Sequence, residues 1–595
     1  MGTTKAGNTA IKDALLAQVS EERLIAFNQQ VAKEIRLSGS EEELRAFQYV
    51  KSELEQFGYE TELSFSDAYI SLPVAAQLSI DGVTYPCITH SMGVSVTGLE
   101  APLMYVGKGQ LDNVPQDDIA GHVLLMDGLA VPNAVQAATE RGAVGLVFVN
   151  ATYTHEMIIS PVWGHPTPET VGLLPSIPAV SVTSQVGEAL KAKLAQSPVT
   201  CSLTTKVDTG FRPIPTLVAE LKGTDTPDDF VLFSGHIDSW HYGAMDNGSA
   251  NALMLEVARI MSEHSKQLKR SLRLAFWSGH SHGRYAGSSQ YCDDHWEELF
   301  EHCVVHINVD SVGGKGSTIL TQANCMAETK QVAADVIKAL LDEEFVGTRY
   351  GRSGDQSFFG PGVPSLFMGL SEQPPADNPA AAAFGELFGG GETGGFGWWW
   401  HTTEDTMDKV DPACLVRDTK VYVSVIHRFL SDSVIPIRQR AAAEEIEAAL
   451  ATWQEKAGQH INLSLARARA KVLVQQLASF ETRLVARPED AAVVRAINRG
   501  LMRLSRMLVP LNYVSGSAFD HDLALSQPPV PKLRDILRLG ECEPGSLDYR
   551  LLKTSLQRKS NEIAFALKQA LEVTEQLLQS GESHRSIDST RGELI

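Results

Sequence analysis

Apolar runs and amphipathic segments alternate through the middle of the chain. The apolar runs are 230–233, 272–277 and 304–309, and the amphipathic segments are 249–262, 286–300 and 327–343. Strands that are apolar on both faces and alternate with helices are typical of a mostly parallel sheet with helices on both sides. Residues 216–435 are therefore predicted to form a doubly wound, mixed α/β sheet.

The residues before and after this sheet follow other patterns. A helix is expected after Ser40, because Ser40 and Glu43 have the spacing of a capping box and apolar residues follow at helical spacing. Residues 60–85 look strand-rich, and short strands joined by Asn-, Pro- and Gly-rich connections continue to about 215. After Pro436 the strand patterns end, and amphipathic helices are expected at 440–457, 461–483, 488–506 and 550–580.

These changes of pattern divide the 595 residues into three units. The α/β unit is discontinuous and takes residues 1–67 and 216–435. A β-rich unit is inserted at 68–215, with strands expected at 121–128, 142–149 and 175–182 and a helix at 134–141. A helical unit covers 436–595.

Charge and cysteine usage exclude several classes of function. The formal net charge is −21 and no block of Lys and Arg occurs, so we expect no nucleic-acid partner. No stretch of about 18 apolar residues is present, so we expect no membrane span. The first ten residues are polar, which argues against a secretory signal. The seven scattered cysteines form no CxxC pair, which favours reduced thiols in the cytoplasm over a disulfide framework or a thiolate zinc site.

Polar residues with metal-binding chemistry follow the predicted strands. His236 and Asp238 come directly after the first apolar run, Asp310 follows the third, and Asp246 precedes a helix. Ligands in open α/β sheets bind beyond the carboxyl ends of the strands, and imidazole and carboxylate groups bind zinc. Taken singly, Asp246 could be a helix cap, and His401 beside three tryptophans could be a packed core histidine.

Together and in this order, the motifs resemble those of the di-zinc aminopeptidase and glutamate-carboxypeptidase family, which also contains the transferrin receptor. The motifs are His236-x-Asp238, Asp246-Asn247-Gly248, Asp310 and His401 to Thr406. The insertion is similar to the protease-associated domain of this family, and the C-terminal helices are similar to its dimerisation domain. The resemblance implies a homodimer whose interface is formed by those helices.

Carried over by position, the resemblance implies a di-metal site. His236 and Asp310 would bind one zinc ion and His401 the other, while Asp246 would bridge the two. Asp238 would orient His236. In the family, a water held by the metals attacks a peptide carbonyl.

The chain departs from the family at its pair of consecutive glutamates. His280 stands at the place of the glutamate that acts as general base, and Ser281 at the place of the one that binds zinc. Histidine can act as a base near neutral pH, so His280 is the hypothesised base. His282 could replace the missing ligand, and Glu392 or Glu404 could supply the missing charge. One or two zinc ions, or another divalent metal, are therefore expected.

Three readings of the function remain open. The leading one is a metal-dependent hydrolase that cleaves an amide bond of a small peptide or an N-acyl amino acid. The second is a non-catalytic binding or scaffold protein on the same fold. The third is a serine hydrolase, because residues 279–283 satisfy G-x-S-x-G and the order Ser281, Asp310, His401 suits a triad.

Further residues are candidates for the substrate pocket. Arg284 and Arg352 could pair with a substrate carboxylate, although a structural ion pair is an equal explanation for each. Trp400 could line a pocket for an apolar group. Asp355 falls where the family has a conformationally sensitive loop near the metals. The sequence leaves open the substrate and the choice between exo- and endo-cleavage.

Overall fold

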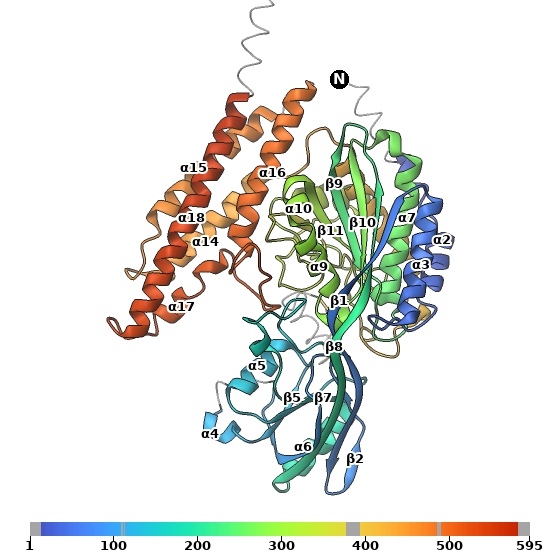
Figure 1. Cartoon of the computed structure of the whole chain (residues 1–595), viewed down its shortest axis with the longest axis vertical. Coiled ribbons are helices and arrows are strands. Elements are labelled where there is room, and N and C mark those ends of the chain that lie inside the picture. The colour runs from blue at the N-terminus through green and yellow to red at the C-terminus, as the bar shows by residue number, and fades with distance from the viewer. Residues whose placement is uncertain (1–12, 109–110, 112–113, 376–392, 485–489, 581–595) are drawn as a thin grey trace, which may run out of the picture.

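The computed structural model describes residues 13–108, 111, 114–375, 393–484 and 490–580. A mixed sheet runs through two regions, and a group of helices stands beside the upper one (Figure 1). The strand order is β12-β11-β9-β10-β8-β4-β5-β6-β7-β3, with β1 pairing to β8 and β2 to β1. This architecture confirms the predicted mixed α/β sheet with a helical C-terminal region.

Four parallel strands form the part of the sheet that positions the site. They are β9 (Thr226–His236), β10 (Arg270–Trp277), β11 (Cys303–Asn308) and β12 (Ser365–Leu366). Every residue of β10 and β11 is buried, as is β9 from Phe230 onward, because helices cover both faces.

The helices lie in layers on the two sides of these strands (Figure 1). One face is covered by α7 (Ala250–Glu263) and α13 (Pro412–Ser431), with α2 (Glu21–Val31) and α3 (Glu41–Gln56) outside α7. The other face carries α9 (Ala286–Asp294) and α10 (Trp296–His302). Helix α11 (Lys330–Leu341) packs against α13.

The observed helices differ from the predicted ones in two places. The helix predicted at 286–300 is two helices, α9 and α10, which meet at His295. Helix α13 was not predicted.

Two long strands carry the chain between the upper and lower regions. β1 (Glu60–Ile80) and β8 (Val199–Leu221) pair antiparallel from Glu60 opposite Glu220 to Ile80 opposite Cys201. The expected boundaries at 68 and 215 fall inside these continuous strands. The lower region is thus an extension of the same sheet and is not joined to it by linkers.

The lower region is built from short elements around a second apolar core. Its strands are β2 (Val83–Tyr85), β3 (Ile88–Thr89), β4 (Val96–Tyr105), β5 (Val123–Asp127), β6 (Gly145–Val149) and β7 (Ala179–Val182). Its helices are α4 (Gln116–Ile119), α5 (Pro132–Glu140) and α6 (Ser184–Leu194).

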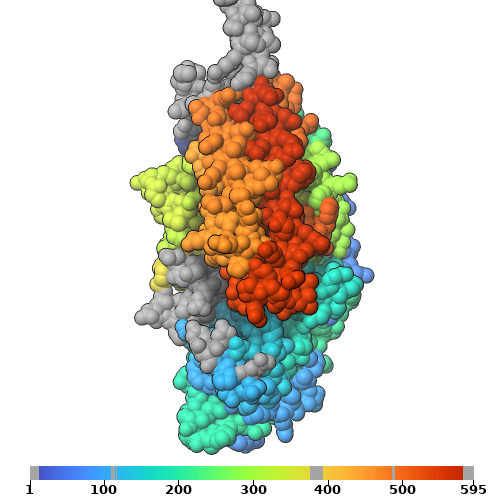
Figure 2. All heavy atoms as spheres, turned by 90° about the vertical axis from the view of Figure 1, so that its left-hand side faces the viewer, coloured from blue at the N-terminus to red at the C-terminus, as the bar shows by residue number. Residues whose placement is uncertain are grey.

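The C-terminal helices cover the upper part of one side of the molecule (Figure 2). They are α14 (Gln439–Ala457), α15 (Ser464–Leu484), α16 (Ala491–Tyr513), α17 (Ile536–Leu539) and α18 (Leu547–Ser580). α18 packs against α15 and α16, and α16 continues past the predicted end at 506. Within the described ranges, no helix has the length and apolar character needed to cross a membrane.

The capping box predicted at Ser40 is only half formed. Ser40 Oγ accepts a hydrogen bond from the Glu43 N–H at 3.2 Å, which starts α3 as expected. The buried Glu43 carboxylate accepts from the Gly39 N–H at 2.7 Å and does not bind the Ser40 N–H. That N–H already donates to the Leu37 carbonyl, so the reciprocal bond of a capping box has no donor left.

Candidate active site

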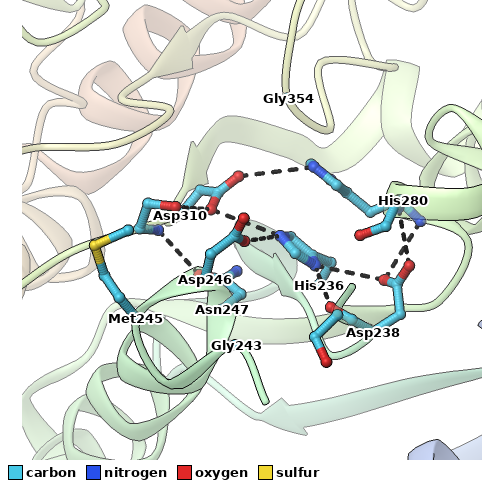
Figure 3. Close-up of polar contacts among 12 residues, drawn as sticks. His236, Asp238, Gly243, Met245, Asp246, Asn247, His280, Asp310 and Gly354 are labelled. Atoms are coloured by element: carbon cyan, nitrogen blue, oxygen red, sulfur yellow. Dashed lines mark hydrogen bonds and ion pairs between the residues drawn. The ribbon is translucent and has the colours of Figure 1, made fainter. Parts of the chain in front are cut away.

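The carboxyl ends of the parallel strands bring the predicted residues together. His236 is the last residue of β9 and lies opposite Trp277, the last residue of β10. His280 comes three residues after β10, and Asp310 comes two residues after β11. Parallel strands end at the same edge of a sheet, so these side chains meet there (Figure 3).

His236, His280, Asp246 and Asp310 form a compact, largely buried cluster (Figure 3). The Nε2 atom of His236 lies 3.3 Å from Asp246 Oδ1 and 3.6 Å from Asp310 Oδ1. His280 Nε2 lies 3.8 Å from Asp310 Oδ2, and the His280 ring stacks on the His236 ring at 3.7 Å between centroids. One ligand atom from each of His236, His280 and Asp310 falls within 4.8 Å of the others, close enough to hold a metal ion.

Asp246 connects this cluster to His401. Its Oδ2 lies 3.1 Å from His401 Nε2, while its Oδ1 faces His236. The other ring nitrogen of His401, Nδ1, donates to the Glu156 carbonyl at 2.6 Å. Glu156 belongs to the inserted region, so the insertion helps to orient a histidine of the site.

Asp238 supports the cluster mainly through the loop that follows β10. His236 Nδ1 donates to the Asp238 backbone carbonyl at 2.9 Å and lies 3.4 Å from the carboxylate. The Asp238 carboxylate accepts hydrogen bonds from Ser38 Oγ at 2.6 Å and from the Ser281 N–H at 2.9 Å. It therefore fixes the position of residues 280–282, while its main chain fixes the ring of His236.

The carboxylates of Asp238, Asp246 and Asp310 stabilise a positively charged group within the cluster. Burial disfavours protonation of His236, but Asp310, Asp238 and Asp246 outweigh this and raise its pKa well above the ordinary value. Burial also raises the pKa of Asp246, yet contacts with His236 and His401 lower it on balance, well below its usual range. A divalent cation would supply the charge that this arrangement stabilises.

The turn after β10 separates His280 from His282. Gly279 has a φ of 71°, the left-handed conformation that glycine tolerates, and α8 (His280–Gly283) follows it. Residues two apart on a helical turn point about 200° away from each other. His280 accordingly faces the cluster, and the structure does not bring His282 into it.

His282 occupies a buried position against Trp240. Its Nδ1 lies 2.8 Å from Ser38 Oγ, and its ring centroid is 4.4 Å from that of Trp240. Burial lowers the pKa of His282 to about 4, so it stays neutral. The surroundings of His282 thus fit a packed side chain better than the metal ligand predicted from the sequence.

Asp355 lies directly behind His280. Its Oδ2 is 2.8 Å from His280 Nδ1, and its Oδ1 accepts from Ser288 Oγ at 2.8 Å. Asp355 is 1% exposed, so the carboxylate is fixed in place by its neighbours. The contact places the hydrogen on Nδ1 and leaves the Nε2 lone pair directed at the cluster.

The predicted substrate-binding residues take different positions. Arg284 borders the cavity beside the cluster, but its Nε donates to the Ser160 carbonyl and its Nη2 to the Ile158 carbonyl. Arg352 donates to the carbonyls of Gln356 and Asp522 and does not line this cavity. Trp400 borders the cavity, and its ring stacks on His401 at 3.3 Å between centroids.

The cavity beside the cluster is small and largely apolar. Its volume is about 80 Å³, and it is bordered by Asp246, His280, Asp310 and His401 on the side of the cluster. The remaining wall is mostly apolar and includes Met157, Ile158, Trp240, Met368 and Phe396. Met157 and Ile158 come from the insertion, which therefore closes one side of the site.

The serine-hydrolase triad is not assembled. Asp310 faces His236 and His280, and both ring nitrogens of His401 are occupied by Glu156 and Asp246. Ser281 lies inside α8, where its N–H donates to Asp238. The G-x-S-x-G pattern thus has another explanation, the glycine turn that presents His280.

Asp405 is a supporting residue that the sequence reasoning missed. Its two carboxylate oxygens accept the N–H groups of Met245 and Asp246, each at 2.9 Å. Burial and the charge of Asp246 raise the pKa of Asp405 to about 7. Asp405 belongs to the run His401 to Thr406 that carries the resemblance, but no sequence signal shows that it holds the backbone of Asp246.

Comparisons with known proteins agree with this geometry. Residues 216–426 match the profile described as Peptidase family M28. A maize protein named probable glutamate carboxypeptidase VP8 is 25% identical over 303 residues, which are 46% of this chain and 41% of that protein. Carboxypeptidase Q of Xenopus laevis is 25% identical over 421 residues, covering 66% of this chain and 82% of that protein.

A solved structure extends the likeness to the fold. An aminopeptidase from Aneurinibacillus sp. strain AM-1 superposes with a TM-score of 0.52 at 22% identity, covering 70% of this chain and 95% of that one. The chain spans less than half of the maize protein and of a glutamate carboxypeptidase 2 homolog from Caenorhabditis elegans. The profile match assigns residues 216–426 to peptidase family M28, and the solved structure shows a shared fold.

Proposed function

We propose that this protein is a metal-dependent peptidase that hydrolyses an amide bond of a small peptide or an N-acyl amino acid. The meeting of His236, Asp246 and Asp310 at the strand ends supports this most directly. The buried Nε2 atom of His236 faces the carboxylates of Asp246 and Asp310 at 3.3 Å and 3.6 Å, and neither contact has hydrogen-bond geometry. Zinc binds imidazole and carboxylate groups, so an ion between these side chains would satisfy the nitrogen.

When bound, zinc would polarise the scissile carbonyl and lower the pKa of a water molecule. The protein's own residues would hold the reactants. Asp246 directs one oxygen to His236 and the other to His401, so its carboxylate holds these two histidines at a fixed separation. The apolar walls limit the contact of the cluster with water, which strengthens the electrostatic interactions inside the cavity.

The shape of the cavity supports a small substrate. About 80 Å³ accommodates a short side chain or acyl group. The Arg284 guanidinium at its border is already hydrogen-bonded to two carbonyls of the insertion. Apolar walls and an occupied guanidinium favour an uncharged group next to the scissile bond over a carboxylate.

Metal removal is the test of this function. We expect a strong chelator to abolish hydrolysis across a panel of dipeptides and N-acyl amino acids, and added zinc to restore it, because no other described group in the cavity replaces the Lewis acid. Initial rates measured by amine release give the answer. Hydrolysis that persists without metal would overturn the proposal, and a zinc-loaded protein that cleaves no member of the panel would favour the scaffold reading.

The homodimer implied by the resemblance is proposed as the functional assembly. Large apolar side chains are exposed on α18, where Leu547 is 72%, Leu551 59% and Phe565 57% exposed. At about 100° per residue these three positions lie within about 40° of one another around the helix. Such an apolar stripe is typical of a covered surface.

Charged substitutions in this stripe are expected to break the dimer. Leu551→Glu with Phe565→Glu should halve the molar mass measured by light scattering, because each places a charge in the buried interface. Val346→Glu serves as the control, since Val346 is 52% exposed outside the helical region. A wild-type protein that is monomeric at micromolar concentration contradicts the assembly.

A further inference from the structure

We propose that His280 replaces the missing carboxylate as a metal ligand and that the centre holds a single metal ion, bound by His236, His280 and Asp310, with Asp246 supplying negative charge beside it. This rests on the proposed metal-dependent function and changes the number of metals and the set of ligands. The family pattern implies two metals, with a glutamate where Ser281 stands.

The distances within the cluster fit one tetrahedral ion. Zinc bonds of about 2.0–2.2 Å place the ligand atoms of a tetrahedral site about 3.3–3.6 Å apart. The separations in the structure are 3.6 Å for His236 Nε2 to Asp310 Oδ1 and 3.8 Å for His280 Nε2 to Asp310 Oδ2, at or just above this range. One ligand atom from each of the three residues lies within 4.8 Å of the others. Three protein ligands are the number that a catalytic zinc ion takes, and the fourth position stays open for water or substrate.

His280 is prepared for this role by the group behind it. A metal-binding histidine usually donates its other ring N–H to a carboxylate, which sets the tautomer and the orientation of the ring. Asp355 provides this carboxylate at 2.8 Å from Nδ1 and is itself held by Ser288. The His280 ring stacks on the His236 ring at 3.7 Å between centroids, which keeps the two rings side by side at the same edge of the sheet.

The position of the second metal has too few ligands. It retains His401 and Asp246, while zinc in catalytic sites takes three protein ligands. Among the described residues, the one group of at least three His, Cys, Asp or Glu side chains close enough to bind a metal is His236, His280 and Asp310. The Glu156 carboxylate lies 3.9 Å from His241, Glu404 does not border the cavity, and Glu392 lies outside the described residues.

The test is the metal content of the full-length protein, purified without chelator and dialysed against zinc. We expect about one zinc ion per protomer by mass spectrometry, and a loss of zinc in His280→Ala. Asp355→Asn should keep one ion with an affinity about 10- to 100-fold lower. His282→Gln is the matched control from the same turn and should retain the full content.

A variant that rebuilds the glutamate pair provides the opposite test. His280→Glu with Ser281→Glu is expected to raise the content to about two ions per protomer. Cobalt substitution gives a second readout, because the visible spectrum of the single site should change in His280→Gln and not in His282→Gln. Far-ultraviolet circular dichroism confirms that each variant is folded.

The outcomes separate this inference from the proposed function. Two ions in the wild type would overturn the single-metal assignment. One ion that is retained in His280→Ala and His280→Gln, with an unchanged cobalt spectrum, would overturn the ligand role of His280. Either result leaves the metal-dependent function standing. No bound zinc, manganese or cobalt in the wild type would overturn both.

Discussion

Replacing Asp246 by alanine is expected to lower kcat/KM by at least about 10³-fold, which corresponds to about 4 kcal/mol of transition-state stabilisation. The carboxylate faces both His236 and His401, at 3.3 Å and 3.1 Å. Its loss removes the negative charge that stabilises a cation in the cluster and the carboxylate contacts that hold His236 and His401 in place. Steady-state kinetics on the best substrate of the panel, with zinc in excess, measures the effect.

Asp229→Asn is the control for this substitution. Asp229 lies on the same strand, β9, near its opposite end, where it contacts His302 at 3.3 Å. We expect its kcat/KM to remain within about twofold of the wild type, because surface substitutions away from the site have small effects. An Asp246→Ala protein that is folded and retains more than a tenth of the activity would refute the role given to this carboxylate.

Asp405→Ala is expected to reduce both stability and activity although Asp405 touches neither metal nor substrate. The substitution leaves the buried N–H groups of Met245 and Asp246 without acceptors and removes a charge that stabilises the buried Arg36. Each unsatisfied buried group costs about 1–3 kcal/mol, so the free energy of unfolding should fall by about 3 kcal/mol or more. Because Asp246 is then displaced, kcat should also fall by about 10²-fold.

The conservative variant separates positioning from general destabilisation. Asp405→Asn retains one carbonyl acceptor, so it should recover part of kcat and part of the stability. Gly187→Ala is a control for stability alone, since an added Cβ would lie 2.2 Å from Val149 in the insertion, far along the chain from the cluster. If Asp405→Ala loses stability but keeps the kcat of the wild type, Asp405 has no positioning role.

The strands of the site region could be predicted because their mostly apolar composition indicates burial on both faces of the sheet. Residues 272–277 and 304–309 are mostly apolar and lack an alternating polar face, which is typical of strands buried on both faces. Helix α13 was missed although Asp411 caps its first turn by accepting from the Ala413 and Cys414 N–H groups and Pro412 follows it. The start signal of α13 is therefore present in the sequence, just after the run His401 to Thr406.

The unit boundaries depended on information that the sequence does not contain. The change of composition at 68 and 215 is real, but β1 and β8 continue through both positions as one antiparallel pair. Long pairing of this kind is set by contacts between residues far apart in the chain. The division into three units stays a prediction, and the structure adds that the sheet continues across both boundaries.

The ligands and their supports differed in how far they could be predicted. His236, Asp246, Asp310 and His401 follow strands or lie in recognisable runs, so their positions relative to the sheet indicated a shared site. The direction in which His280 points and the contact with Asp355 depend on the turn at Gly279 and on tertiary packing. The sequence therefore suggested a base at His280, whereas its distance to Asp310 favours a ligand.

The most direct test of the metal centre is a crystal of the zinc-loaded protein measured at the zinc absorption edge. The account predicts one anomalous peak within about 2.2 Å of His236 Nε2, His280 Nε2 and an oxygen of Asp310. A fully occupied zinc ion at another position, or a zinc-loaded crystal without a peak at the ends of β9, β10 and β11, would contradict it.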